Sequence, residues 1–164
     1  MVEEIRTERL VLRRARLDDV HAMHSIMRNP DAMRFWSTLP HERLEQTEAW
    51  LRDMIDGPAH GGDDFLVELD GRVIGKMGGW RLPEIGYLLD PAVWGRGYAY
   101  EGLRAYVDYR RGCGSTELTA DTDPRNTASR RLLEKCGFVE TGHAANTWFI
   151  GGEWFDSIYY RLEL

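Results

Sequence analysis

The chain has 164 residues, of which 43% are hydrophobic and 29% are charged, and its formal net charge is −6 with a pI near 5.4. This size and balance fit one globular domain, 1–164, with a core of its own. General nucleic-acid binding needs a basic surface, so the acidic balance argues against it. An acidic surface suits a cationic partner such as an amine.

No apolar run approaches the length of a transmembrane helix, so no membrane partner is expected. Charged residues begin at Glu3, no signal peptide is visible, and the expected location is the cytoplasm. The two cysteines, Cys113 and Cys136, and the five scattered histidines show no metal-ligand spacing, so no metal site is expected.

The first part of the chain predicts a strand followed by two helices. Alternating residues predict the strand over 9–15, and the acidic pair at 18–19 then opens a helix that Pro30 ends. Apolar residues spaced for one buried stripe predict the second helix over 42–55. A glycine-rich loop at 57–62 separates these elements from the strands that follow.

A hairpin is predicted at 65–76, because Asp70-Gly71 fits a tight turn between two apolar runs. The remaining elements are a strand at 84–89, a helix from Tyr98 to about Arg111, a strand at 116–120, a helix at 126–136 stopped by Gly137, and strands at 138–141 and 154–162. The order β-α-α-β-β-β-α-β-α-β-β predicts an α+β protein built around one mixed sheet.

The segment 94–99, WGRGYA, says most about function. It lies between the strand at 84–89 and the helix that begins near Tyr98. Several backbone N–H groups are exposed there, at the positive end of that helix. Such a turn suits a pyrophosphate, and glycine permits the positive φ it requires. No P-loop is present, and Tyr100 stands where a dinucleotide fingerprint needs its third glycine. Taken alone, the turn also fits an ordinary strand–helix connection.

The arrangement resembles the GNAT superfamily of acyl-CoA-dependent N-acetyltransferases, in its RimJ/RimL-like branch. The resemblance is carried by 7–13 (TERLVLR), by the run from Glu84 through WGRGYA to Glu101, and by 126–138 (NTASRRLLEKCGF). In the family's loop, Gln/Arg-x-x-Gly-x-Gly/Ala, Gly97 and Ala99 match, whereas Trp94 replaces the leading Gln or Arg. The resemblance implies a mixed, mostly antiparallel sheet, flanked by helices on both faces and splayed at its central strand.

The same resemblance implies acetyl-CoA as co-substrate. The turn amides bind the pyrophosphate, Arg96 adds a charge-assisted bond, and the strand at 87–89 pairs with the pantetheine amides. Arg130 and Arg131 are near enough in sequence to reach the adenosine phosphate, although a solvated helix face explains them equally well. The expected cofactor-binding residues are Tyr87, Leu88, Leu89, Trp94, Gly95, Arg96, Gly97, Tyr98, Ala99, Asn126, Ser129 and Arg130. Asn126 also suits a helix N-cap.

Two residues are expected to be catalytic. Glu84 stands where several family members carry a catalytic glutamate, so the resemblance implies that it is the general base, with an exposed structural carboxylate as the alternative. Many relatives use a tyrosine to protonate the departing thiolate, but Leu133 occupies that position here. Ser129 is the expected substitute, polarising the sulfur rather than acting as a strong acid.

Aromatic residues are expected to shape the acceptor site, because their faces attract an amine cation and cover its carbon frame. The candidates are Phe35, Trp36, Trp80 and Trp148, with core packing as the alternative for each. Trp36 is the best of them, since it lies in the polar, proline-bounded segment 34–40 rather than on a periodic apolar face.

The sequence therefore predicts an N-acetyltransferase that moves an acetyl group from acetyl-CoA directly to a primary amine. That amine is either a protein N-terminus or a small molecule, and a homodimer is one arrangement that the resemblance allows. A non-catalytic acyl-CoA-binding sensor stays open, because Leu133 and Trp94 depart from the family pattern. A nucleotide-binding protein has little support, since neither phosphate fingerprint is complete.

Overall fold

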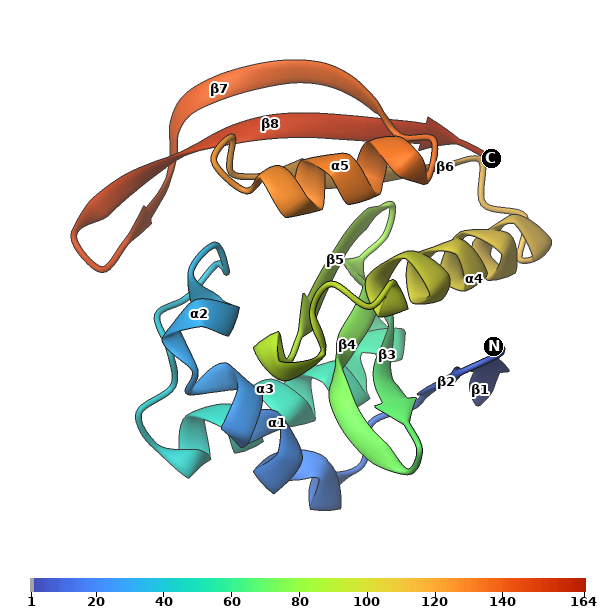
Figure 1. Cartoon of the computed structure of the whole chain (residues 1–164), viewed down its shortest axis with the longest axis vertical. Helices are drawn as coiled ribbons and strands as arrows, with labels where there is room; N and C mark the ends of the chain where they lie inside the picture. The colour runs from blue at the N-terminus through green and yellow to red at the C-terminus, as the bar shows by residue number, and fades with distance from the viewer. Residues whose placement is uncertain (1) are drawn as a thin grey trace.

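An eight-stranded sheet forms the centre of the protein, in the order β1-β2-β3-β4-β5-β6-β8-β7 (Figure 1). The computed structural model describes residues 2–164. The strands are β1 (Glu4–Arg6), β2 (Leu10–Arg13), β3 (Asp63–Leu69), β4 (Arg72–Arg81), β5 (Glu84–Leu89), β6 (Glu117–Thr122), β7 (Val139–Ile150) and β8 (Glu153–Glu163). All neighbouring strands are antiparallel except β5 and β6, which confirms the predicted fold class.

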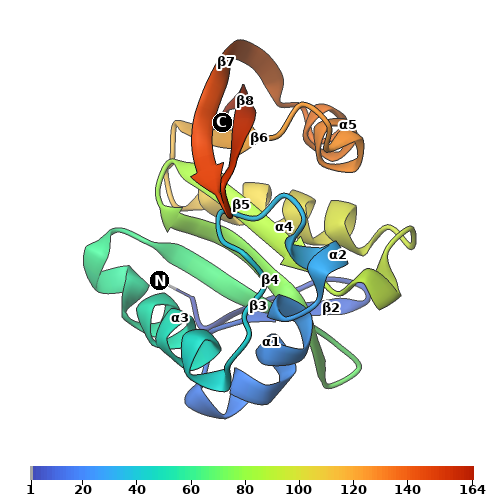
Figure 2. The ribbon, with the colours of Figure 1, turned by 90° about the vertical axis from the view of Figure 1, so that its left-hand side faces the viewer.

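Helices cover both faces of the sheet, as the α+β prediction requires (Figure 2). They are α1 (Val20–Met27), α2 (Pro30–Met33), α3 (Leu44–Asp56), α4 (Tyr98–Gly112) and α5 (Thr127–Lys135), with 3-10 turns η1 (Leu17–Asp19), η2 (Gly57–His60) and η3 (Pro91–Val93). Alternation along β3 separates two cores: Phe65 packs with Tyr106 of α4, whereas Leu66 packs with Met23 of α1 and Leu51 of α3. The helices of the first half therefore cover one face, and α4 and α5 the other.

The sheet opens between β5 and β6. These two parallel strands pair at one position, Glu84 with Thr119, and diverge beyond it. Strands β6, β8 and β7 consequently stand with α5 at one end of the molecule, and the other strands at the opposite end (Figure 1). This is the splay that the sequence resemblance implied, and it frees the edge of β5 from residue 85 onward.

Three features of the fold differ from the sequence prediction. The short strand β1 was not predicted, and Pro30 starts α2 as well as following α1. Asn29 explains the new helix, because its side chain accepts a hydrogen bond from the Asp31 amide at 2.9 Å and caps it. Strand β7 continues to Ile150 rather than ending at residue 141, although most of it is exposed and carries little apolar alternation.

The pairing of strand β7 with β8 is irregular at its middle. Its register with β8 shifts between Ala144 and Trp148, and Asn146 there adopts a positive φ of 54°. A bulge of this kind re-aims the side chains that follow it.

Among residues 2–164, no helix combines the length and hydropathy that a bilayer crossing needs.

Candidate active site

The glycine turn joins η3 to α4 and has the geometry of an anion site. Gly95 and Gly97 have φ values of +73° and +82°, in the left-handed region that side chains rarely adopt. At Gly95 no atom lies within 4 Å of the position a Cβ would take, so conformation rather than crowding requires glycine. The first α-helical bond runs from the Glu101 amide to the Gly97 carbonyl at 3.0 Å. The amides of residues 98–100 therefore have no acceptor within the helix and are available to an anion.

Side chains from three segments hold this turn in place. The Trp94 indole donates to the Leu89 carbonyl at 3.0 Å, which ties the turn to the end of β5. Arg9 donates to the Arg96 carbonyl at 3.1 Å and to the Glu101 carboxylate at 2.6 Å. Trp94, which departs from the family motif, thus has a structural role in the turn, and Glu101 is engaged by the N-terminal segment.

A cavity of about 630 Å³ runs from the glycine turn to the start of α5. It is lined by all the expected cofactor residues except Arg96 and Arg130, namely by Tyr87, Leu88, Leu89, Trp94, Gly95, Gly97, Tyr98, Ala99, Asn126 and Ser129. We call this cavity the cofactor cleft. It combines the amide site of the turn with the open edge of β5, so it suits a long ligand that carries a phosphate group.

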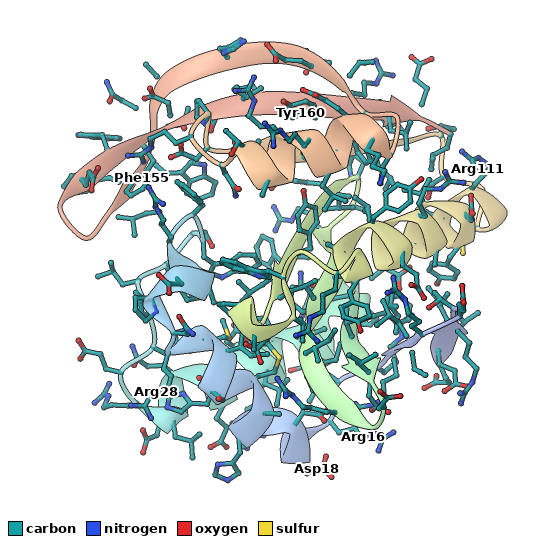
Figure 3. The ribbon with its side chains drawn as sticks, viewed as in Figure 1. Arg16, Asp18, Arg28, Arg111, Phe155 and Tyr160 are labelled. Carbon is teal, nitrogen blue, oxygen red and sulfur yellow. The ribbon has the colours of Figure 1, made fainter. Side chains whose placement is uncertain are left out.

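Arg131, not Arg130, lies along the cofactor cleft. The Arg130 guanidinium donates to the Pro124 carbonyl at 3.2 Å and to the hydroxyl of Tyr160 at 3.3 Å, so it faces β8. Tyr160 is labelled on that strand in Figure 3. Successive residues of a helix differ by about 100° in direction, and this rotation separates the two neighbours. Lys135, one turn beyond Arg131, also lines the cleft, as do the cationic residues Arg34 and Arg125.

A second cavity of about 760 Å³ adjoins the cofactor cleft, and we call it the acceptor cavity. The two share Phe35, Trp36, Tyr87, Asn126 and Ser129. Seven aromatic residues line the acceptor cavity: Phe35, Trp36, Trp50, Trp80, Tyr87, Trp148 and Phe155. All three tryptophans expected at the acceptor site, Trp36, Trp80 and Trp148, are among them.

The rings come from both sides of the opened sheet. Phe35 follows α2, and Phe155 lies on β8 (Figure 3). The Arg125 guanidinium stacks over both, at 5.8 and 5.1 Å from their ring centroids. Trp80 and Trp148 are 63% and 43% exposed, so they stand at the mouth of the cavity. The acceptor cavity is therefore an aromatic cup that opens to solvent.

Carboxylates are interspersed with these rings. Asp53, Glu84, Asp121 and Asp156 line the acceptor cavity, and a buried pair, Asp64 with Lys76, lies at its wall with 2.6 Å between Oδ1 and Nζ. Asp123 and Arg81 line the cavity as well, so six carboxylates stand against two cations, and the wall is negative overall and suits a cation.

Glu84 stands at the point where the sheet opens, as the first residue of β5. Partial burial and the nearby Asp121 carboxylate raise the pKa of Glu84 above its ordinary value of 4.5. Asp121 in turn accepts a hydrogen bond from the Trp148 indole at 3.0 Å. A solvent-accessible carboxylate with a raised pKa can accept a proton from an amine directly or through water.

Ser129 lies in the first turn of α5, where the Asn126 side chain accepts from its amide at 3.2 Å and caps the helix. Its Oγ is 2.6 Å from the hydroxyl of Tyr87 on β5. Burial is the main influence on the Tyr87 hydroxyl and raises its pKa well above the ordinary 10. Leu133, one turn further along α5, is buried and offers only an apolar side chain to the acceptor cavity.

Sequence reasoning missed Asp121 and the Tyr87 hydroxyl as parts of the site. The strand predicted at 116–120 stopped one residue before Asp121, whereas β6 continues to Thr122. Tyr87 was expected to contribute its backbone, and its contact with a residue 42 positions later is a product of the tertiary fold. An acidic residue directly after a predicted strand was the available signal for Asp121.

A sheet splayed beside a helix N-terminus, with a second cavity meeting the cleft, defines an acyl-CoA-dependent acetyltransferase. The acetyltransferase (GNAT) domain family matches residues 9–139, and the chain belongs to this family. This confirms the family and the enzyme class predicted from the motifs.

Known relatives agree with this assignment. The chain is 29% identical over 156 residues to the uncharacterized N-acetyltransferase p20 of Bacillus licheniformis, covering 86% of this chain and 85% of p20. A solved GNAT-family acetyltransferase from Bacillus anthracis superposes with a TM-score of 0.85 at 26% identity, covering 98% of each chain. Spermidine N-acetyltransferase from Vibrio cholerae, solved with CoA and spermine, shares the fold with a TM-score of 0.82 at 23% identity and 96% coverage of both chains.

Proposed function

We propose that this protein transfers an acetyl group from acetyl-CoA directly to a primary amine, without a covalent acyl-enzyme. The observation that carries the proposal is the meeting of two cavities of different character. One has free helix amides and cationic side chains, and the other has aromatic rings and carboxylates. Ser129 and Tyr87 line both, so the thioester belongs at their junction.

The cofactor cleft matches acetyl-CoA group by group. The pyrophosphate lies at the amides of residues 98–100, and Arg131 and Lys135 offset its charge. The pantetheine arm follows the free edge of β5 over residues 87–89, and its amides pair with the strand as an added strand does. In this pose the acetyl group reaches the junction beside Ser129.

The acceptor cavity favours a small cationic amine over a long peptide. Its volume of about 760 Å³ lies within the roughly 300–1,000 Å³ typical of small-molecule sites. Aromatic faces and carboxylates both attract an ammonium group. The Vibrio cholerae relative was solved with spermine, a molecule of this class. We propose a small-molecule amine as acceptor, with a protein N-terminus as the alternative that the same assay detects.

The reaction begins with an ammonium ion that must lose a proton. Neutralising an amine of pKa ~10.4 at neutral pH costs roughly 4–5 kcal/mol, so a base is valuable. Glu84 takes this proton, and the neutral nitrogen attacks the thioester carbonyl. The N–C bond forms, the nitrogen loses its second proton to solvent, the C–S bond breaks, and sulfur keeps the electron pair until solvent protonates it. Ser129 then donates a hydrogen bond to the developing thiolate.

The test is release of CoA thiol from acetyl-CoA, followed with a thiol-reactive dye across pools of small amines and N-terminal peptides. We expect turnover in a pool of small cationic amines, and loss of that turnover in Glu84→Gln. Calorimetric binding of acetyl-CoA without turnover in any pool would favour a non-catalytic acyl-CoA sensor. Absence of binding would overturn the assignment of the cofactor cleft.

A further inference from the structure

We propose that Tyr87 is a positioning residue, which orients the Ser129 hydroxyl toward the thioester sulfur and strengthens it as a donor. The inference rests on the proposed function and extends it to a residue whose side chain the fold brings to the reaction centre. The two hydroxyl oxygens are 2.6 Å apart, a short distance for an O–H···O bond.

The contact spans the opening of the sheet. Tyr87 lies on β5, where the sheet divides, and Ser129 lies on α5, on the far side of the division. Both residues line the cofactor cleft and the acceptor cavity. The pair therefore lies at the junction of the two cavities, where the acetyl group would pass from sulfur to nitrogen, rather than inside the hydrophobic core.

The direction of the hydrogen bond decides what Ser129 can do. A serine hydroxyl has one proton and two lone pairs. If Tyr87 donates to the serine oxygen, the serine proton is free to point to a third atom. Burial raises the pKa of Tyr87, so its hydroxyl keeps a proton to donate; the Ser129 Oγ at 2.6 Å is a nearer acceptor for it than the Ser129 carbonyl at 3.4 Å. A chain from Tyr87 to Ser129 to sulfur also polarises each bond in the same sense.

Ser129 needs this support because α5 offers no stronger donor there. Leu133, the next residue of α5 that lines the acceptor cavity, is apolar. In the transfer step the N–C bond forms, the C–S bond breaks, and the electron pair moves to sulfur. Ser129 donates a hydrogen bond to that sulfur while Tyr87 donates one to Ser129, and no proton leaves Tyr87. The nitrogen loses two protons in all: Glu84 takes the first from the ammonium ion, and the second, lost once the N–C bond has formed, balances the proton that sulfur takes from solvent.

The kinetic test compares Tyr87→Phe, Ser129→Ala and the double variant. We expect each single variant to lower kcat by roughly 10- to 100-fold, the worth of a hydrogen bond to a charged group. The KM values for acetyl-CoA and amine should stay within about twofold, because the contact matters when charge develops on sulfur. The double variant should lose no more than either single one, since both remove the same donor chain.

Tyr106→Phe is the matched control. It also deletes a buried phenolic hydroxyl, which donates to the Asp63 carbonyl at 2.9 Å, but Tyr106 lies on α4 in the core and lines neither cavity. It should leave kcat unchanged. An unchanged kcat in Tyr87→Phe would overturn the proposal, and so would losses that multiply in the double variant.

A second measurement needs no amine and separates this inference from the proposed function. Near pH 8.5, where a thiol is partly ionised, the wild type should bind CoA several-fold more tightly than desulpho-CoA. Tyr87→Phe and Ser129→Ala should both abolish this preference, and Tyr106→Phe should keep it. If the wild type binds CoA but acetylates nothing, the proposed function fails and this comparison still decides the role of Tyr87. A preference that survives in Tyr87→Phe, or that is absent in the wild type, would overturn the inference.

Discussion

Arg9 and Glu101 are joined by a hydrogen-bonded ion pair, with 2.6 Å between Nε and Oε2, although 92 positions separate them. The same carboxylate accepts a hydrogen bond from the Thr7 hydroxyl at 2.6 Å. The start of the chain is thereby fastened to the first turn of α4. The N-terminal segment that resembles the family thus supports the anion site from outside.

Arg9→Ala should weaken acetyl-CoA binding because it removes the bond to the Arg96 carbonyl and the ion pair to Glu101 together. Arg9 is partly exposed, so we expect a rise in Kd of roughly fivefold rather than complete loss. Isothermal titration calorimetry measures it. Arg52→Ala is the control, since Arg52 forms an ion pair on the exposed face of α3, 2.7 Å from Glu48. Equal Kd values for the two variants would show that Arg9 does not support the turn.

Gly97→Ala should strain the turn, because alanine at a φ of +82° costs about 1–2 kcal/mol. We expect a lower melting temperature and a weaker affinity for acetyl-CoA. Gly112→Ala is a control with the same added atom, at the end of α4, where no atom lies within 4 Å of the new Cβ. That change should be neutral or slightly stabilising. A Gly97→Ala protein as stable and as tightly binding as Gly112→Ala would contradict the prediction.

Glu84 should govern the acidic limb of the kcat/KM profile. Burial and repulsion from Asp121 raise its pKa above 4.5, so activity should fall as pH drops through a midpoint above that value. Glu84→Gln should lower kcat/KM by roughly 100-fold or more and remove this limb. Asp121→Asn should move the midpoint to lower pH, because it removes the like charge that disfavours the ionised form.

Asp108→Asn controls for a general change in charge. Asp108 pairs with Arg111 at 2.8 Å on the exposed side of α4, away from both cavities. Its substitution should leave the pH profile in place. If Asp121→Asn behaves like Asp108→Asn, Asp121 does not tune the pKa of Glu84.

The sequence predicts the parts of the site that local patterns specify. Strand β5 is bounded as predicted, and the glycine turn and the Asn126 cap occur where short-range chemistry requires them. Strand β7 was predicted too short, because its exposed residues carry no alternating apolar signal and pairing with β8 holds them.

Two details of the site depend on orientation, which residue spacing does not fix. Arg130 and Arg131 are equivalent in sequence, and only the rotation of α5 about its axis brings Arg131 to the cofactor cleft. The meeting of Tyr87 with Ser129 depends on how far the two halves of the sheet separate. Long-range geometry of this kind follows from packing over the whole domain.

Trp148 should determine acceptor affinity without affecting the cofactor. It lines the acceptor cavity but not the cofactor cleft, and its indole donates to the Asp121 carboxylate at 3.0 Å. Trp148→Ala should raise the KM for the amine by roughly tenfold and leave the Kd of acetyl-CoA unchanged. Trp154→Ala removes a 55% exposed tryptophan from β8, across the same hairpin but outside the cavity, and should change neither constant. A matching rise in both variants would point to loosening of the hairpin instead.

His41 should make the stability of the protein depend on pH. The buried Thr47 hydroxyl lies 2.7 Å from Nδ1 of both His41 and His24. That hydroxyl carries one proton, so in this arrangement it donates to one ring and accepts from the other. Burial, and then the charge of His24, lower the pKa of His41 below 6.5.

The unfolded chain therefore binds a proton at His41 more readily than the folded chain does. Stability should be steady above about pH 7 and should fall as the pH drops below 6.5. The His41 amide also donates a hydrogen bond to the Met27 carbonyl at 2.9 Å, which closes the segment 27–41 that contains Trp36. Protonation of His41 should therefore destabilise this segment as well. Urea unfolding of His41→Gln at pH 5.5, 6.5 and 7.5 should show a smaller decline than the wild type. His60→Gln, at an exposed histidine after α3, should retain the full decline; an unchanged decline in His41→Gln would assign the pH dependence to other groups.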